Sequence, residues 1–435
     1  AYQGKSRILI ASADGPDPAT VDRVMLLRER QSRIFYNRQF FNYPLRLNLA
    51  TLRKLGLARV VRIVVTYGLS ILFPRRPEKT LEDFFINRFG TELYHSFFQS
   101  YTEKVWGVAC TTISAEWGAQ RVKGLSVRKA VWDFIDKSWR RVLGVPQRQV
   151  ETSLIGQFLY PKYGPGQMWE EVARRVEERG GSVRLSCRVE RVLVRGGLVR
   201  GVEVVCKRTG KREVLEGDFV FSTMPIRDLV GALDAPVPAS VQKVAAGLRY
   251  RDFITVGVLV RGLRFQDSAT GGLIRDNWIY VQEPDVQVGR IQIFNNWSPY
   301  LVAQPDTVWL GLEFFCSEGD DLWLKSDTDM IALAIDELVT LGFVGRDAVL
   351  DATVVRVPKT YPAYFGTYGR FSVVREYLER FPNFVPLGRN GMHRYNNQDH
   401  SMLTAMVAVD TIVAGSTDWS KVWSVNTEQD YHEAK

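Results

Sequence analysis

A short apolar run near the C-terminus, followed by a glycine-containing loop and a helical pattern, is the feature that most constrains the fold. The apolar run is 384–387, the loop carries Gly388, Arg389 and Gly391, and a helix is expected from about Asp399 to Val413. Glycine lets a backbone approach a ligand closely, and the unpaired N–H groups that begin a helix attract a phosphate or another electron-rich group. The pattern indicates a ligand-binding strand–turn–helix unit, with a purely structural turn as the alternative.

Periodicity predicts helices in the first part of the chain and strands in most of the rest. A hairpin is expected around Asn37, and an aromatic stripe at helical spacing over 81–101 is interpreted as core. A helix over 167–179 leads into a β-meander over 182–222, and Ser326 or Asp327 is expected to begin a further helix. No internal repeat or low-complexity linker appears, so the domains are expected to be interwoven.

Length and composition are those of an ordinary globular protein with two or three domains. Of the 435 residues, 46% are hydrophobic and 24% are charged, which excludes disordered, collagen-like and disulfide-scaffold proteins. No apolar run approaches the ~18 residues that a membrane-spanning helix needs. The four cysteines are far apart and the four histidines form no cluster, so neither a disulfide framework nor a metal site is expected.

The excess positive charge lies at the N-terminus. Residues 1–80 contain 15 Lys and Arg against 5 Asp and Glu, and the whole chain carries +9. Nucleic acid is disfavoured as a partner because the arginines are spread through apolar sequence without a recognisable binding module. The segment Leu52–Phe73 mixes Arg and Lys with Leu and Val. We consider two interpretations of it: a peripheral helix on an anionic membrane, or a packed helix with a solvated basic face.

Several motifs, taken in order, resemble the flavin amine-oxidase superfamily. The Gly388-Arg389 turn with its helix, the strand ending at Val189 and the segment Ser222-Thr223-Met224-Pro225 resemble its FAD-binding half. Three further motifs are similar to those of bacterial protoporphyrinogen-oxidase-like and UDP-galactopyranose-mutase-like oxidoreductases: Phe40-Phe41-Asn42-Tyr43-Pro44-Leu45, Tyr101-Thr102-Glu103-Lys104-Val105-Trp106-Gly107 and Tyr163-Gly164-Pro165-Gly166. The resemblance covers the chain from about Val24 onward.

The resemblance implies an α/β fold of mixed α and β elements. A glutathione-reductase-like FAD-binding domain, discontinuous and N-terminally incomplete, would accompany a substrate domain of mixed β-sheet with a helical subdomain. The expected segments are a polar leader (1–30), a helical substrate subdomain (31–150), an FAD-domain helix and β-meander (151–228), a β-rich substrate domain (229–375) and a C-terminal FAD-domain strand, loop and helix with a tail (376–435).

The first 30 residues depart from the family pattern. The family begins with a strand, a Gly-x-Gly-x-x-Gly turn and a helix that holds the FAD pyrophosphate. Lys5–Ala11 could form a strand, but Asp14-Gly15-Pro16-Asp17-Pro18 cannot replace that glycine turn. We therefore expect that the chain lacks the first ~70 or more residues of the family, which include this βαβ unit. A chain of this kind would bind flavin weakly or not at all.

The resemblance also implies the site residues. Four would lie against the flavin: Gly388, Arg389, Gly391 and Met392. Asp399 would lie near the ribityl or phosphate end, Val189 would hold the adenine side through its backbone, and Ser222, Thr223 and Pro225 would line the dinucleotide cleft. Arg389 would be the charge partner of flavin or substrate, and Tyr395 would contact a substrate diphosphate. Asn397 stands where the mutases have an acidic residue.

The expected function is FAD-dependent oxidation, with hydride transfer from substrate to flavin N5, because the cofactor carries this chemistry. Trp278, Tyr280 and Asn296 suit the walls of a pocket for a ring-bearing or sugar substrate. One alternative is a redox-neutral mutase that acts on a nucleotide sugar, and another is a flavin-free remnant or membrane-associated scaffold. A cytoplasmic location is expected because no signal peptide is recognised, with peripheral contact to the cytoplasmic membrane face left open.

Overall fold

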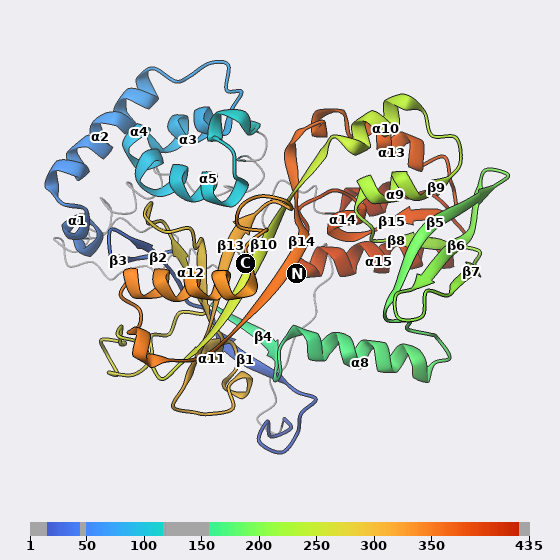
Figure 1. Cartoon of the computed structure of the whole chain (residues 1–435). Helices are drawn as coiled ribbons and strands as arrows, with labels where there is room; N and C mark the ends of the chain where they lie inside the picture. The colour runs from blue at the N-terminus through green and yellow to red at the C-terminus, as the bar shows by residue number, and fades with distance from the viewer. Residues whose placement is uncertain (1–14, 44–48, 116–117, 119–155, 426–435) are drawn as a thin grey trace. The chain divides into compact units, whose positions relative to one another are not determined.

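A computed structural model of the chain describes residues 15–43, 49–115, 118 and 156–425. These residues form two compact units, which Figure 1 shows with their helices and strands. Unit 1 holds the described residues up to 178 together with 253–356, and unit 2 holds 179–252 together with 357–425. Each unit is therefore built from chain segments that are distant in sequence.

Unit 1 contains a seven-stranded sheet with the order β14-β10-β13-β12-β11-β2-β3. Its strands are β2 (Ser32–Tyr36), β3 (Gln39–Asn42), β10 (Leu248–Val260), β11 (Trp278–Val281), β12 (Arg290–Ile293), β13 (Val308–Cys316) and β14 (Val349–Gly366). The hairpin predicted around Asn37 is confirmed: β2 and β3 pair antiparallel, and Asn37 and Arg38 take positive φ angles of 50° and 58°. The strands β10 and β14 begin in one unit and end in the other.

The core of unit 1 lies between this sheet and α12 (Asp327–Thr340). Ile254, Ile291 and Leu312 of the sheet are fully buried, as are Met330 and Leu338 of the helix. Alternate residues of a strand face the same side, which is why these sheet positions reach one apolar layer. The predicted N-cap of α12 is confirmed at Ser326, whose Oγ accepts a hydrogen bond from the backbone N–H of Asp329 at 3.1 Å.

A helical layer completes this part of unit 1 (Figure 1). It comprises α1 (Leu49–Leu55), α2 (Leu57–Leu72), α3 (Leu81–Phe89), α4 (Thr91–Tyr94), the π-helix η1 (His95–Gln99), α5 (Ser100–Trp106) and the short 3-10 helix η2 (Cys110–Thr112). The aromatic stripe is core, as predicted, because Phe84, Phe85 and Phe97 are buried. Lys104 of α5 donates to the carbonyls of Glu283 and Val288, both at 3.0 Å. Burial lowers the pKa of Lys104 to about 8. The predicted helical region beyond 118 lies outside the described residues.

The remaining elements of unit 1 are short or peripheral. They are β1 (Met25–Glu29) paired antiparallel with β4 (Gln157–Pro161), α8 (Pro165–Glu178), α11 (Phe294–Trp297), η3 (Pro299–Leu301) and η4 (Arg346–Ala348). The predicted helix over 167–179 is confirmed as α8, which follows Gly164 with a φ angle of 89°.

Unit 2 contains a four-stranded sheet of order β7-β6-β5-β9 and a separate parallel pair, β15-β8. The strands are β5 (Cys187–Arg195), β6 (Leu198–Cys206), β7 (Arg212–Glu216), β8 (Val220–Ser222), β9 (Leu233–Asp234) and β15 (Phe384–Pro386). The helices are α9 (Ile226–Ala232), α10 (Ala239–Ala246), η5 (Tyr368–Arg370), α13 (Ser372–Leu378), α14 (Gly388–Gly391), α15 (Gln398–Val413) and α16 (Ser420–Ser424).

The predicted β-meander is confirmed for β5, β6 and β7, but its predicted end at Ser222 is wrong, because β8 is a separate strand that pairs with β15. The start of the meander is also corrected. The first strand begins at Cys187 rather than at Ser182, because Ser186 takes a positive φ of 58° that ends any extended backbone before it. The strand then continues to Arg195 without a break, and the register shift between Val189 and Arg191 marks a bulge at Glu190. Pairing with β6 therefore resumes one residue later on β5 than on its partner.

Asn383 ties the parallel pair to the meander. Its side-chain Nδ2 donates to the carbonyls of Val199 at 2.7 Å and Asp218 at 2.8 Å, and its Oδ1 accepts from the N–H of Val199 at 3.0 Å. The side chain is 8% exposed. A buried amide that satisfies three backbone groups fixes the entry to β15 relative to β6 and β8.

Candidate functional site

The carboxyl ends of β8 and β15 meet at the start of the glycine-containing loop. Pro386 pairs with Ser222 in the parallel register, and the N–H of Leu387 donates to the carbonyl of Ser222 at 2.8 Å. A Cβ atom added to Gly391 would lie 2.3 Å from the Ser222 oxygen and 3.2 Å from the Cα of Thr223. The structure thus brings Ser222 and Thr223 together with the glycine loop, and Gly391 is required by the contact between these two backbone segments.

Three side chains of this loop bind backbone carbonyls of β14. Nη1 of Arg389 donates to Thr360 at 3.0 Å, and Nδ2 of Asn390 donates to Lys359 at 3.0 Å. Nε2 of His393 lies 3.2 Å from the carbonyl of Ala363. The loop is consequently held along one stretch of β14, which sequence reasoning did not anticipate.

Arg389 is half-buried and carries its charge against neutral groups. Its Nε donates to the carbonyl of Asn396 at 2.7 Å, and its guanidinium carbon lies 4.9 Å from the ring centre of Tyr395 and 5.2 Å from that of Tyr361. The two tyrosine rings are stacked, with centroids 5.3 Å apart and planes 12° apart. Among the described residues, no carboxylate pairs with Arg389. Within the described residues its charge is therefore met only by carbonyl oxygens and aromatic rings.

His393 is buried beneath the loop, with 1% of its surface exposed. Burial lowers the pKa of its imidazole to about 4, so the ring is neutral at physiological pH. The ring packs edge-on against Tyr250 and beside Phe371, with centroid distances of 4.9 Å and 5.9 Å. Its Nδ1 has no hydrogen-bond partner among the described residues, and neither does the buried Oδ1 of Asn390.

Three further predicted residues occupy different surroundings. Met392 is 1% exposed and belongs to an apolar cluster with Leu387 and Trp423, so its side chain is part of the core. Asp399 lies in the first turn of α15, is largely exposed and approaches His400 Nδ1 at 3.3 Å. Gly388 takes a positive φ of 69° at the start of α14, which glycine adopts without strain.

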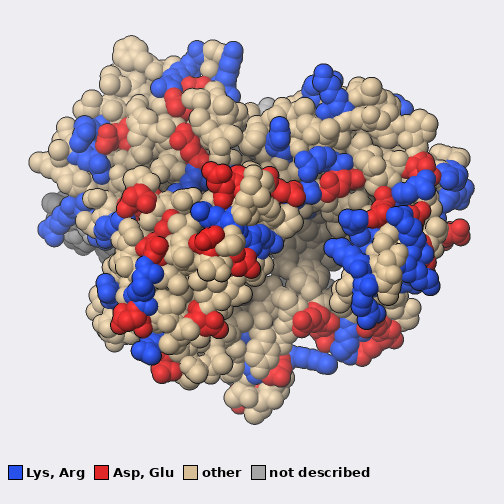
Figure 2. All heavy atoms as spheres, in the orientation of Figure 1, with Lys and Arg blue, Asp and Glu red and all other residues tan. Residues whose placement is uncertain are grey.

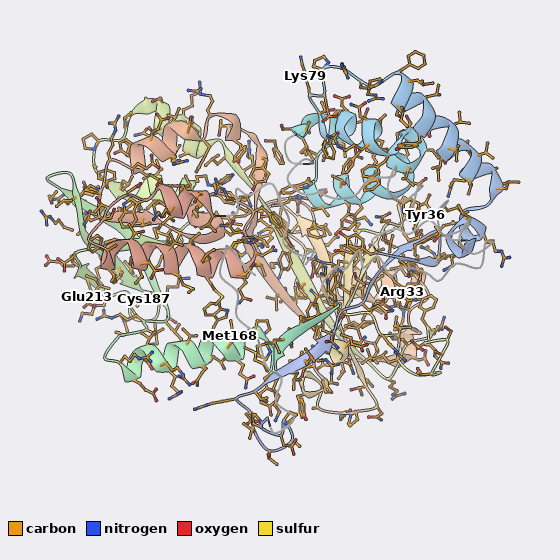
Figure 3. The ribbon with its side chains drawn as sticks, turned by 180° about the vertical axis from the view of Figure 1, so that it is seen from behind. Arg33, Tyr36, Lys79, Met168, Cys187 and Glu213 are labelled. Atoms are coloured by element: carbon orange, nitrogen blue, oxygen red, sulfur yellow. The ribbon has the colours of Figure 1, made fainter. Side chains whose placement is uncertain are left out.

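A groove of about 690 Å³ runs along β5 in unit 2. Val189, Met224 and Pro225 line it, which unites two regions that the sequence assigned to the cofactor. It is further lined by Cys187, Arg188, Glu190, Lys207, Asp228, Gly231 and Ala232. Figure 3 labels Cys187 at the start of β5 and Glu213 on β7, the strand on the far side of β6. Val189 pairs with Val204 of β6 on one side of β5, and on the opposite side β9 pairs only with Val192 and Leu193, so no described strand covers that side of β5 at Val189.

The predicted substrate residues of unit 1 lie on and beside β11. Trp278 and Tyr280 face the same side, and Trp278 stacks on Trp297 at 5.5 Å with an angle of 17°. The buried Nε1 of Trp278 has no hydrogen-bond partner within the described part of the chain. Asn296 instead serves the fold, since its Nδ2 donates to the carbonyls of Ile274 and Asp276 at 2.8 Å and 2.7 Å.

Sequence reasoning missed several groups that complete these sites. Tyr361, which stacks on Tyr395, and Lys207 and Asp228, which line the groove, carry no motif of their own. Their part in the two sites can be recognised only from their positions in the folded structure. Within the described ranges, no cluster of His, Cys, Asp and Glu is placed to hold a metal ion.

A family model for flavin-containing amine oxidoreductases matches residues 47–393. A reduced UDP-galactopyranose mutase is 19% identical at a TM-score of 0.74, over 94% of this chain and 84% of that one. A putative protoporphyrinogen oxidase from Exiguobacterium sp. 255-15 is 17% identical at a TM-score of 0.55, over 85% of this chain and 77% of that one. Cyclohexylamine oxidase from Brevibacterium oxydans IH-35A is 11% identical at a TM-score of 0.51, over 86% of this chain and 78% of that one. These similarities confirm the mixed α/β fold that the sequence predicted.

Proposed function

Because the chain belongs to the family of flavin-containing amine oxidoreductases, we propose that unit 2 binds FAD and that the protein oxidises a small ring-bearing or sugar-like molecule. Bound FAD would supply the two-electron chemistry by accepting a hydride from a carbon–nitrogen or carbon–carbon bond. The observation that carries the proposal is the groove along β5. It contains Val189 and Pro225, two residues that were assigned to the cofactor from sequence.

The groups along the groove fit the nucleotide half of FAD. A volume of about 690 Å³ is within the range of ligand sites. The edge of β5 at Val189 offers a backbone N–H and C=O, which can pair with the acceptor and donor edge of adenine. Asp228 offers a carboxylate for a ribose hydroxyl, and Lys207 offers a cation for a phosphate. This chemistry supports a nucleotide rather than a purely apolar ligand.

Arg389 is proposed to hold the charge at the redox-active end of the cofactor. Two of its nitrogens are fixed by the carbonyls of Thr360 and Asn396, so the orientation of the guanidinium is set before a ligand binds. Stacked tyrosine rings cover it, and a partly buried cation attracts electron density more strongly than a solvated one. Arg389 would therefore favour the electron-rich, reduced form of a bound flavin or the charge of a substrate.

The aromatic side chains at β11 are proposed to bind the substrate. Trp278, Trp297 and Tyr280 present ring faces and edges, and the Nε1 of Trp278 is a buried donor without a partner in the described chain. Ring faces bind flat apolar or sugar surfaces, and an unpaired indole N–H is suited to an oxygen of such a ligand. Asn296 is not included, because its amide is committed to backbone carbonyls.

The proposal is tested by FAD binding and by filling the groove. The purified chain should show flavin absorption bands or should quench flavin fluorescence on titration with FAD. Gly231 lines the groove, and a Cβ atom added to it would meet no atom within 4 Å, so Gly231→Trp should fill the groove without displacing the fold. Gly369→Trp is the matched control, because Gly369 has the same open space outside the groove.

We expect Gly231→Trp to weaken FAD binding at least ~10-fold, as for the loss of a well-fitted contact, and Gly369→Trp to leave it unchanged. Failure of the wild-type chain to bind FAD would overturn the proposal and favour the flavin-free protein that the departure in the first 30 residues predicts. Equal FAD binding by wild type and Gly231→Trp would show that the groove is not the nucleotide site. If FAD binds, reduction of the flavin by a panel of amines and cyclic substrates under anaerobic conditions tests the oxidation.

A redox-neutral mutase acting on a nucleotide sugar is the second candidate. Arg389 beside Tyr395 is the observation that favours it, because a guanidinium and a phenol suit a diphosphate. Incubation of the reduced protein with UDP-galactopyranose separates the two candidates. A ring-contracted product would support the mutase, whereas no product and no UDP binding would remove it.

A further inference from the structure

Helix α2 (Leu57–Leu72) turns much of its polar side toward the protein. Ile63 and Ser70 are its two buried residues, and Thr66 lies on the same side, where its Oγ1 accepts from the N–H of Glu92 at 3.3 Å. Arg59 also faces this side and approaches the carboxylate of Glu92 at 3.4 Å. Ser70, Thr66 and Arg59 thus occupy the inward positions where an ordinary surface helix carries apolar residues.

The opposite side of α2 is apolar and exposed. Positions three, four and seven residues apart share a helix face, and seven residues of this face are at least half exposed: Leu57, Val61, Val64, Val65, Leu69, Ile71 and Leu72. Phe73, which follows the helix, is 75% exposed. A contiguous exposed apolar face of this kind marks an interaction site rather than a solvated surface. We name these eight residues the α2 face.

Cations surround the α2 face. Between 49 and 80 the sequence contains seven Lys and Arg but one Asp or Glu, Glu78, and Glu78 is paired with Arg88 at 2.7 Å. Arg53, Arg62, Arg76 and Lys79 are exposed, and none of them is paired with an acidic group in the described part of the chain. In Figure 2 the surface over α2 is mostly uncharged, with Lys and Arg and some Asp and Glu at its margins, and Figure 3 places Lys79 on the loop that follows α2.

The charge around the α2 face distinguishes between two candidate binding partners, a second copy of the chain and an anionic lipid surface. A second copy of the chain would pair this face with itself about a two-fold axis. The exposed Lys and Arg residues beside the face would then meet those of the other copy and repel them. An anionic lipid surface offers acyl chains to the apolar residues and negative headgroups to the cations. Since no described helix is both long and apolar enough to cross a membrane, the contact would lie in the membrane interface.

We propose that the α2 face docks the protein on an anionic lipid surface, with the apolar residues inserted among the headgroups and Arg53, Arg62 and Arg76 bound to lipid phosphates. This interaction is independent of flavin binding, so it stands or falls separately from the proposed activity. The full chain should sediment with vesicles of phosphatidylcholine that contain about 30 mol% phosphatidylserine, and not with phosphatidylcholine alone. Binding should fall steeply at about 0.5 M salt.

Two sets of variants test the α2 face and the cations beside it. Val64→Asp with Leu72→Asp should abolish vesicle binding, whereas Val409→Asp with Val413→Asp, on exposed apolar positions of α15, should not. Replacing Arg53, Arg62 and Arg76 by Gln should weaken binding by about fivefold per cation, on the order of a hundredfold in all. Circular dichroism of each variant checks that the fold is retained.

Binding to anionic vesicles alone, lost in the α2 variant and kept in the α15 variant, supports the proposal. Absent binding, equal binding to neutral vesicles, or binding that the α2 substitutions leave unchanged overturns it. A dimer in sedimentation velocity that dissociates in the α2 variant, without vesicle binding, also overturns it and assigns the face to a second copy.

Discussion

Replacing His393 by asparagine should make the free energy of unfolding less dependent on pH between 7 and 4. The wild-type imidazole is 1% exposed, and burial lowers its pKa to about 4 from the 6.5 of a free histidine. Between these pH values the unfolded chain binds a proton that the folded chain excludes, so stability is present above pH 6.5 and is lost as pH falls toward 4. The loss is about 2 kcal/mol at pH 5 and about 3 kcal/mol at pH 4.

Asparagine is the appropriate replacement because His393 has a positive φ of 46°, a conformation that asparagine tolerates. Urea unfolding followed by tryptophan fluorescence at pH 7, 6, 5 and 4.5 gives the comparison, since Trp423 lies beside Phe371, which packs on His393. His95→Asn, at an exposed position, controls for the loss of an imidazole. Parallel pH profiles for wild type and His393→Asn would refute the reasoning, because they would show that the ring is protonated as readily in the folded as in the unfolded protein.

Three other predictions concern single contacts. Gly391→Ala should lower stability by roughly 1–3 kcal/mol because its Cβ would meet the Ser222 oxygen, and thermal melting beside the unhindered Gly369→Ala checks it. Burial lowers the pKa of Lys104 to about 8, so as the pH rises the folded protein loses this proton at a lower pH than the unfolded chain does. The stability of wild type relative to Lys104→Met should then rise by about 2 kcal/mol between pH 7 and 9.5 in urea unfolding, and a flat difference would contradict it. Cys187 and Cys206 are opposite in the β5–β6 register, next to a hydrogen-bonded Ser186–Lys207 pair. At a Cα separation of about 4.5 Å, glutathione disulfide should link them, as peptide mass spectrometry would show, and failure to link would question the register.

Local signals predicted local elements. The Asn37 turn, the Ser326 cap and the glycine before α8 each act within a few residues, and the structure confirms the hairpin and both helices. The pairing of β8 with β15 and the bonds of Asn383 join residues far apart in sequence, where a periodic pattern carries no information. The partners of Arg389 were hidden for the same reason, because Thr360 contributes only a backbone carbonyl.

The segment Leu52–Phe73 shows a different limit of sequence reasoning. Its apolar and basic residues are compatible with a packed helix and also with a helix on a lipid surface. Periodicity defines two faces, but it does not say which one the rest of the protein covers. The contacts of Arg59 and Thr66 with Glu92 supply that information, since they place the polar side inward.

The division of unit 2 into two chain segments has a consequence for its synthesis. Asn383 bonds to Val199, 184 residues away, and residues 253–356 of unit 1 are translated between the two halves. Because a chain leaves the ribosome from its N-terminus, β8 must wait for its partner strand β15 while the rest of the sheet of unit 1 is being made. Nascent chains that stop before β15 would expose the edge of β8. Such incomplete chains should be strong clients of chaperones, whereas unit 1 could assemble earlier.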